Sequence, residues 1–186
     1  MPIQIREADN SDIAGIVRVI HAVFDEYGFT WEEDGYHADL YDIEGHYTGR
    51  GHTFFVAESD GLVIGTAALE RFAMIDGPLG ELRLLDGFFR VQGCDCSLER
   101  LYVHPEARRC GAGLALLEQV VAMAKSEGRL AMELWTDKRF VDAHRLYGRL
   151  GAKATGDRIC HDPDQSPEWG MMIDLRGRAQ EANDVA

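Results

Sequence analysis

Apolar residues recur at two different periods in the first part of the chain. Alternation over residues 3–5 predicts a short strand, whereas apolar positions three and four apart from Ile13 to Phe24 predict an amphipathic helix. We expect that helix to end near Gly28, because glycine commonly terminates helices. Two further apolar runs, residues 53–58 and 62–72, are separated by an Asp-Gly pair and therefore predict a β-hairpin.

A strand–loop–helix unit in the middle of the chain has the clearest pattern. The run from Leu98 to Val103 predicts a strand, and Pro105 ends it because proline cannot donate to a sheet. Apolar positions three and four apart from Leu114 to Ala124 predict a helix that begins near Gly111. The loop between them is rich in arginine and glycine. Such a loop suits a bound phosphate, since glycine admits close approach and a helix N-terminus offers unpaired N–H groups.

Two segments have weaker patterns. Residues 27–47 mix aromatic and acidic side chains, and we expect a loop and a second helix around Tyr36 to His46. Residues 73–94 contain Gly-Pro and Asp-Gly pairs, which predict an extra hairpin or a long loop before the central strand.

The C-terminal part completes the expected fold. Its patterns predict a strand at 130–136, a helix from Ala143 to Leu150, and two strands at 153–158 and 169–175. We expect one domain over residues 1–175, followed by a disordered tail at residues 176–186.

Composition narrows the possible functions. The chain has 186 residues and a formal net charge of −13, which argues against binding to nucleic acid because that depends on basic side chains. No apolar run approaches the roughly 18 residues of a membrane-spanning helix, and no secretory signal is evident. The four cysteines form no disulfide framework. We therefore expect a cytoplasmic protein without a membrane partner.

The sequence of the loop after the central strand indicates which class of phosphate ligand it could bind. A dinucleotide-binding loop would need a third glycine where Leu116 stands, and the Gly-Lys-Ser/Thr of a P-loop is absent. Leu-x-Val-x-Pro followed by Arg-x-x-Gly-x-Gly instead resembles the pyrophosphate loop of the GNAT superfamily of acyl-coenzyme A-dependent N-acyltransferases. The predicted order βααβββαβαββ is similar to the α/β fold of that family, a mixed sheet (α+β) flanked by helices. In that fold the fourth and fifth strands splay apart.

The resemblance implies acetyl-CoA as co-substrate. Its pantetheine arm would pair with the backbone of Leu101 and Val103, and backbone amides from Arg109 to Leu114 would bind the pyrophosphate. The implied cofactor-binding residues are Leu101, Tyr102, Val103, Arg108, Arg109, Cys110, Gly111, Ala112, Gly113 and Leu114.

Two residues are candidates for proton transfer. Tyr147 lies in an Ala-x-x-x-Tyr-x-x-x-Gly segment that resembles the family's, where the tyrosine sits near the cofactor sulfur and can protonate it. A packing role for Tyr147 stays open. Strand alternation puts Glu99 on the same side as Leu101 and Val103, where it could act as the base, although a solvated or ion-paired carboxylate fits the sequence equally well. Glu133, Asp137 and His104 are weaker candidates.

The aromatic and acidic stretch from Tyr27 to Asp42 corresponds to the family's variable acceptor region. Carboxylates with aromatic walls suit a cationic amine, and the expected acceptor-binding residues are Tyr27, Phe29, Trp31 and Glu32. A solvated acidic helix face is the alternative.

Together these features predict an N-acetyltransferase that transfers an acetyl group to a primary amine in a ternary complex. A small-molecule or peptide amine is the expected acceptor, and the chain is expected to be a monomer or homodimer. A non-catalytic acyl-CoA sensor is the alternative. Phe140 departs from the family, which often has asparagine there. We expect no metal site, because the spacing of Cys94, Cys96, Cys160 and His161 is not that of zinc sites.

Overall fold

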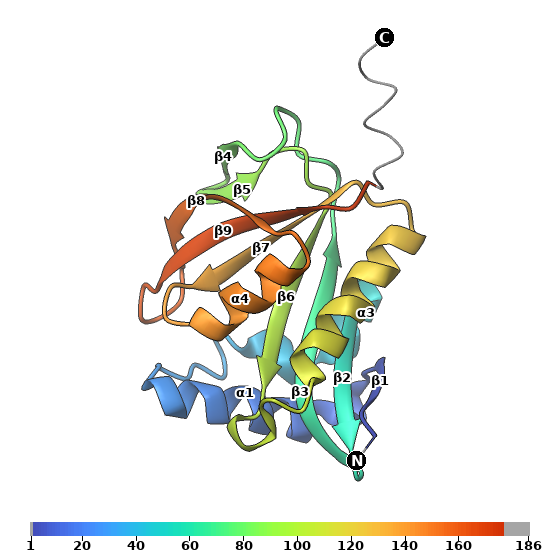
Figure 1. Ribbon diagram of the computed structural model, residues 1–186. Coiled ribbons are helices and arrows are strands. Elements are labelled where there is room, and N and C mark those ends of the chain that lie inside the picture. Colours follow the sequence, from blue (N-terminus) through green and yellow to red (C-terminus); the bar gives the residue numbers. More distant parts are fainter. Residues whose placement is uncertain (1, 177–186) are drawn as a thin grey trace.

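The computed structural model describes residues 2–176, which contain one mixed sheet and a separate hairpin (Figure 1). The main sheet has seven strands in the order β1-β2-β3-β6-β7-β9-β8, and β4 pairs only with β5. Of the neighbouring pairs in the main sheet, only β6 and β7 run parallel. The mixed fold is therefore confirmed. The strands are β1 Gln4–Glu7, β2 Thr53–Ser59, β3 Leu62–Arg71, β4 Leu82–Leu85, β5 Phe88–Val91, β6 Cys96–Val103, β7 Ala131–Asp137, β8 Lys153–Ile159 and β9 Pro167–Asp174.

Helices cover both faces of this sheet. The α-helices are α1 Ile13–Tyr27, α2 Ile43–His46, α3 Ala112–Ser126 and α4 Val141–Arg149. Side chains alternate along β2, so Phe54 and Val56 pack with α1 while Phe55 and Ala57 pack with α3 on the other face. Gly28, in a left-handed conformation, ends α1 as predicted. The α1 and α3 helices thus bury two separate apolar cores against opposite faces.

The second helix expected around Tyr36 to His46 is broken into short pieces. A 3₁₀ turn at Ala38–Tyr41 precedes α2, and another at Thr48–Arg50 follows it. Asp42 causes the break, because its backbone is not helical and its carboxylate accepts a hydrogen bond from the Gly45 N–H at 3.0 Å. The segment is therefore a compact loop with one helical turn of α2.

Of the two possibilities expected for residues 73–94, an extra hairpin or a long loop, the structure contains the hairpin. It consists of β4 and β5, joined by Asp86 and Gly87. Both joining residues have positive φ, 49° and 86°, as a two-residue hairpin turn requires. The chain thus adds a small second sheet beside the main one.

Two irregularities in β6 determine where ligands can enter. The β6 strand pairs with β7 only from Cys96 to Leu98, after which the two strands diverge (Figure 1). Its register with β3 shifts between Thr66 and Ala68, and Arg100 has a φ of 51°. Since β6 and β7 are the fourth and fifth strands of the main sheet, the predicted splay is confirmed. The shift is a β-bulge centred on Arg100.

The predicted C-terminal tail lies outside the described residues, except for Arg176. Among residues 2–176, the structure contains no helix with the length and apolar character needed to cross a membrane.

Candidate active site

The loop between β6 and α3 presents backbone donors. Gly111 has a φ of 95° and precedes the first residue of α3, and the earliest intrahelical bond runs from Ala115 N–H to the Gly111 carbonyl at 3.0 Å. The amides of Ala112, Gly113 and Leu114 come before that bond and have no intrahelical acceptor. No described side chain caps this terminus. The end of the helix is therefore free to bind an anion.

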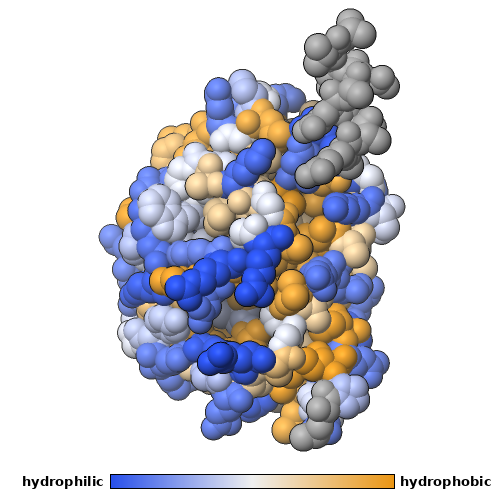
Figure 2. Space-filling model, in the orientation of Figure 1, coloured by the Kyte–Doolittle hydropathy of each residue, from blue (hydrophilic) through white to orange (hydrophobic). Residues whose placement is uncertain are grey.

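A cavity of about 740 Å³ lies against this helix terminus. Figure 2 shows a hollow on this face of the molecule, bordered by hydrophilic residues. The cavity lining includes each predicted cofactor residue except Cys110, whose thiol instead donates to the Ala107 carbonyl at 2.8 Å. Four arginines line it, at positions 108, 109, 145 and 149. Arg108 also forms a two-bond ion pair with Glu26 on α1, at 2.8 and 2.5 Å. Helix amides and guanidinium groups together fit a diphosphate.

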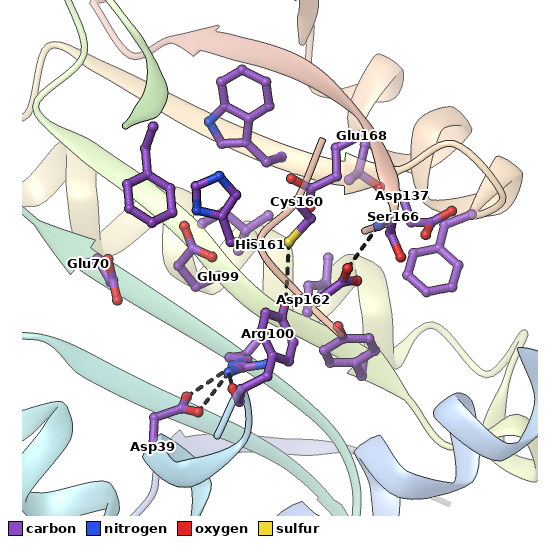
Figure 3. Close-up of a pocket in the computed structure, with 18 of the residues that line it drawn as sticks. Asp39, Glu70, Glu99, Arg100, Asp137, Cys160, His161, Asp162, Ser166 and Glu168 are labelled. Atoms are coloured by element: carbon purple, nitrogen blue, oxygen red, sulfur yellow. Dashed lines mark hydrogen bonds and ion pairs between the residues drawn. The ribbon is translucent and has the colours of Figure 1, made fainter. Parts of the chain in front are cut away.

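A second cavity, of about 560 Å³, lies on the other side of the splayed strands (Figure 3). It contains both predicted proton-transfer residues, Glu99 on β6 and Tyr147 on α4. Leu101, Tyr102 and Phe140 line both this cavity and the one at the α3 terminus. The two cavities therefore meet where β6 and β7 separate.

The β-bulge changes which side each β6 residue faces. Glu99 lies opposite Ala68 and Tyr102 opposite Thr66, so two residues of β6 face a single residue of β3. Leu101 and Val103 consequently pack on the α3 side of the sheet. The prediction that Glu99 shares a side with Leu101 and Val103 is wrong, because it assumed unbroken alternation.

With this geometry established, the chain can be compared with known proteins. The sequence model of the acetyltransferase (GNAT) family matches residues 16–152. The chain belongs to the GNAT family. N-acetyltransferase 8 of Mus musculus is 34% identical over 122 residues, covering 65% of this chain and 48% of that protein. The chain thus spans about half the length of this curated relative.

Solved GNAT structures share the fold. An acetyltransferase of the family from Staphylococcus aureus Mu50 superposes with a TM-score of 0.71 at 20% identity, covering 94% of this chain and 100% of that one. The structure of yncA from Salmonella typhimurium, described with its cofactor acetyl-CoA, gives 0.67 at 23% identity, covering 95% and 96%. These similarities establish the GNAT fold of the chain, and a neighbour with that fold binds acetyl-CoA.

Among the carboxyl groups of this GNAT site, Glu99 has the most strongly shifted pKa. The pKa of Glu99 is raised to about 8, mainly by burial and then by the negative charge of Glu70, while Arg158 opposes the change. Glu70 lies on β3 next to β6, and Figure 3 shows the two carboxylates on these neighbouring strands. Glu99 therefore releases its proton near neutral pH, which is the range a general base needs.

Tyr147 is suited to hold a proton. It is 5% exposed and lines the cavity that contains Glu99. Burial raises the pKa of the phenol well above 10, the nearby Tyr102 and Glu99 contribute to the increase, and a hydrogen bond with Thr136 opposes it. The hydroxyl thus stays protonated at neutral pH and can act as a donor.

The weaker candidates from the sequence already have partners. Glu133 binds Arg90 at 2.5 Å and the Val91 N–H at 2.6 Å, and Asp137 is held by Arg139. Their carboxylates are therefore engaged in structural contacts.

The predicted acceptor residues lie in three different places. Phe29 lines the cavity with Glu99, whereas Tyr27 lines the cavity at the α3 terminus. Both rings pack against Phe140, at centroid distances of 5.9 and 4.9 Å. Trp31 stacks on His37 at a centroid distance of 3.8 Å, and Glu32 is exposed. Neither residue lines either of these two cavities. Their contact with an acceptor stays a prediction.

Sequence reasoning missed several residues that line the cavity. Arg100 forms a two-bond ion pair with Asp39 at 3.0 and 2.6 Å, and it donates to the Tyr36 carbonyl at 2.7 Å. Cys160 and Glu168 reach the cavity from the β8–β9 region. No local pattern links these segments, since the pairing of Arg100 with Asp39 spans 61 positions.

Metal ligation has no candidate among residues 2–176. No group of three or more His, Cys, Asp or Glu side chains in that part of the chain is placed to hold a metal ion.

Proposed function

We propose that this GNAT chain is an N-acetyltransferase that transfers the acetyl group of acetyl-CoA to a primary amine by direct attack in a ternary complex. The meeting of the two cavities at Leu101, Tyr102 and Phe140 is the observation that carries this proposal. It gives two ligands access to one point from opposite sides of the sheet. We further propose that one domain, residues 1–175, performs the reaction.

The chain's own groups would bind the co-substrate on the α3 side. The amides of Ala112 to Leu114 and the guanidinium of Arg109 would hold the diphosphate, through charge-assisted hydrogen bonds. Beyond Leu98, β6 has no β7 partner, so backbone groups along that edge are available to pair with the pantetheine arm. Acetyl-CoA, when bound, would supply the thioester that reacts.

Two proton movements follow from the groups in the other cavity. The Glu99 carboxylate would take a proton from the acceptor ammonium, directly or through one water molecule, to leave a nucleophilic amine. The amine nitrogen would form a bond to the acetyl carbon as the bond from that carbon to sulfur breaks, and the Tyr147 hydroxyl would donate its proton to the departing sulfur. The second proton lost by the amine nitrogen would return to the Tyr147 oxygen. The elevated pKa values of both groups suit these opposite roles, because one group gains a proton near neutral pH and the other holds one.

Replacing Tyr147 with phenylalanine tests this assignment. The change removes one hydroxyl and keeps the ring, so kcat should fall by about 10²–10⁴-fold. The Kd for acetyl-CoA should change little, since the proton is transferred in the transition state. Thiol release with a panel of amines measures turnover, and calorimetry measures acetyl-CoA binding.

Tyr41→Phe is the matched control, because Tyr41 is half-buried and lines neither cavity. Full turnover by Tyr147→Phe would assign Tyr147 to packing and leave water as the acid. A wild-type chain that binds acetyl-CoA but acetylates none of the amines would contradict the proposal and favour a sensor.

A further inference from the structure

The β4–β5 hairpin is anchored to the main sheet at two points. Glu133 on β7 holds β5 through Arg90 and the Val91 N–H, while Arg158 on β8 donates to the Phe89 carbonyl at 3.2 Å. The Phe88 ring also contacts the His161 ring at a centroid distance of 4.3 Å. The hairpin is therefore fixed beside the cavity that contains Glu99.

A further cavity, of about 470 Å³, lies between this hairpin and the sheet. It is continuous with the cavity of Glu99 and Tyr147, because the two share Glu70, Phe88, Glu99, Trp135 and Arg158. We call it the hairpin compartment. Its other walls come from four apolar residues and three charged ones: Phe72, Ala73, Ile75, Leu85, Asp86, Arg90 and Glu133.

The charges in the hairpin compartment do not balance. Its two arginines are already paired, Arg90 with Glu133 and Arg158 with Glu168. Asp86, which is exposed at the hairpin turn and also lines the compartment, forms no salt bridge with any residue among 2–176. Glu70 and Glu99 form none with those residues either, and both are half-buried. Their mutual repulsion favours protonation of Glu99. A cation placed beside Glu70 would relieve it.

We propose that the acceptor is a linear amine with a second positive charge, whose distal ammonium binds Glu70 in the hairpin compartment while its reacting amine lies beside Glu99 and Tyr147. Its methylene chain would lie along Phe88 and Trp135, which line both cavities. This inference rests on the proposed acetyl transfer and adds the substrate class. A simple diamine is the smallest molecule with both features.

Two amines of equal chain length test this selectivity. For the wild-type chain, kcat/KM should be about 10- to 100-fold higher with 1,5-diaminopentane than with 1-aminopentane, as expected for one additional charge-assisted hydrogen bond. Glu70→Gln should reduce this preference to less than about threefold. Because the Glu70 charge acts on Glu99 with both amines alike, the readout is the ratio of the two kcat/KM values in each protein and not either value alone. The difference should appear mainly in KM.

Glu81→Gln provides a matched control, since it removes the same charge near the hairpin from an exposed residue outside the compartment lining. It should keep the preference for the diamine. Equal kcat/KM values for the two amines in the wild-type chain, or an unchanged preference in Glu70→Gln, would overturn the inference while leaving acetyl transfer intact.

Calorimetry on the full chain loaded with coenzyme A tests the preference for the diamine independently of turnover. The diamine should bind at least tenfold more tightly than the monoamine, and Glu70→Gln should abolish that difference. Tighter diamine binding with no acetylation of any amine would refute the proposed function and support the second binding point. Equal binding would refute the selectivity itself.

Discussion

Replacing Glu99 with glutamine should change both the stability and the pH profile of the chain. Burial near Glu70 raises the pKa of Glu99 from the usual 4.5 to about 8. Between these values the folded chain holds a proton that the unfolded chain releases. The stability contributed by Glu99 is therefore complete below pH 4.5 and is lost as the pH rises through 8. Glutamine does not titrate and avoids this loss.

The magnitude follows from the size of the pKa change. One pKa unit corresponds to about 1.4 kcal/mol, and a fully buried carboxyl with this change would lose on the order of 5 kcal/mol. Glu99 is half-buried and contacts a solvent-accessible cavity, so screening reduces the effect. We expect Glu99→Gln to be about 1–3 kcal/mol more stable than wild type at pH 8.5 and equal to it near pH 4.5.

Urea denaturation at several pH values measures this difference directly. All other groups titrate alike in both proteins, so the change in the difference with pH isolates Glu99. A difference that stays constant from pH 4.5 to 8.5, or wild type becoming the more stable protein as the pH rises, would refute the assigned environment.

The same variant tests the catalytic role. If Glu99 is the base, wild-type kcat/KM should rise about tenfold per pH unit below pH 8 and then level, apart from the titration of the amine itself. Glu99→Gln should lower kcat/KM by about 10²–10⁴-fold, and the remaining pH dependence of kcat/KM should reflect only the titration of the amine substrate. Wild-type activity with an unaltered profile would mean that water carries the proton instead.

Two further changes test the co-substrate loop and the bulge. Gly111→Asp should weaken acetyl-CoA binding by at least about tenfold in calorimetry, because it places a negative charge at the N-terminus of α3. Two control variants should bind acetyl-CoA much more tightly than Gly111→Asp does. Gly111→Ala changes the same positive-φ position without adding charge, and Gly128→Asp adds the charge at the other end of α3. Equal affinity in Gly111→Asp would remove the diphosphate assignment. Asp39→Asn should lower the free energy of unfolding, measured in urea, by about 2–3 kcal/mol, because it leaves the largely buried guanidinium of Arg100 without its charged partner. A loss below about 0.5 kcal/mol would contradict a stabilising role of the Arg100–Asp39 pair.

The sequence was sufficient to locate a helix, a turn or a binding loop wherever the residues that determine it lie close together in the chain. The spacing of apolar residues located α1, α3 and α4, because each buries one face over several turns. The Asp-Gly pairs located both hairpin turns, since these residues tolerate positive φ. The arginine and glycine pattern before α3 located the cavity that fits a diphosphate. Tyr147 was identified through its segment, and it lines the cavity that contains Glu99.

The cavity that contains Glu99 and Tyr147 was harder to predict because its residues come together only through tertiary structure. The acidic stretch that suggested an acceptor site contains Glu32, which is exposed, whereas Glu70 comes from a strand that showed no sign of chemistry. Asp42 interrupted the expected helix by capping a shorter one. The hairpin could be predicted as a hairpin, but its position over the sheet depends on Glu133 and Arg158. These contacts link segments that have no common sequence pattern.

The bulge at Arg100 explains how one strand can line both cavities. A left-handed conformation at a residue other than glycine costs about 1–2 kcal/mol, and it persists only where the surroundings stabilise it. Arg100 receives that stabilisation from its two bonds to Asp39 and its bond to the Tyr36 carbonyl, each worth about 1.5–3 kcal/mol for a charged group. These contacts fix the Arg100 side chain on the side of the sheet that the bulge gives it. Because of the bulge, Glu99 faces the cavity that contains Tyr147 while Val103 packs toward α3, and a regular strand would have turned both toward the same side of the sheet.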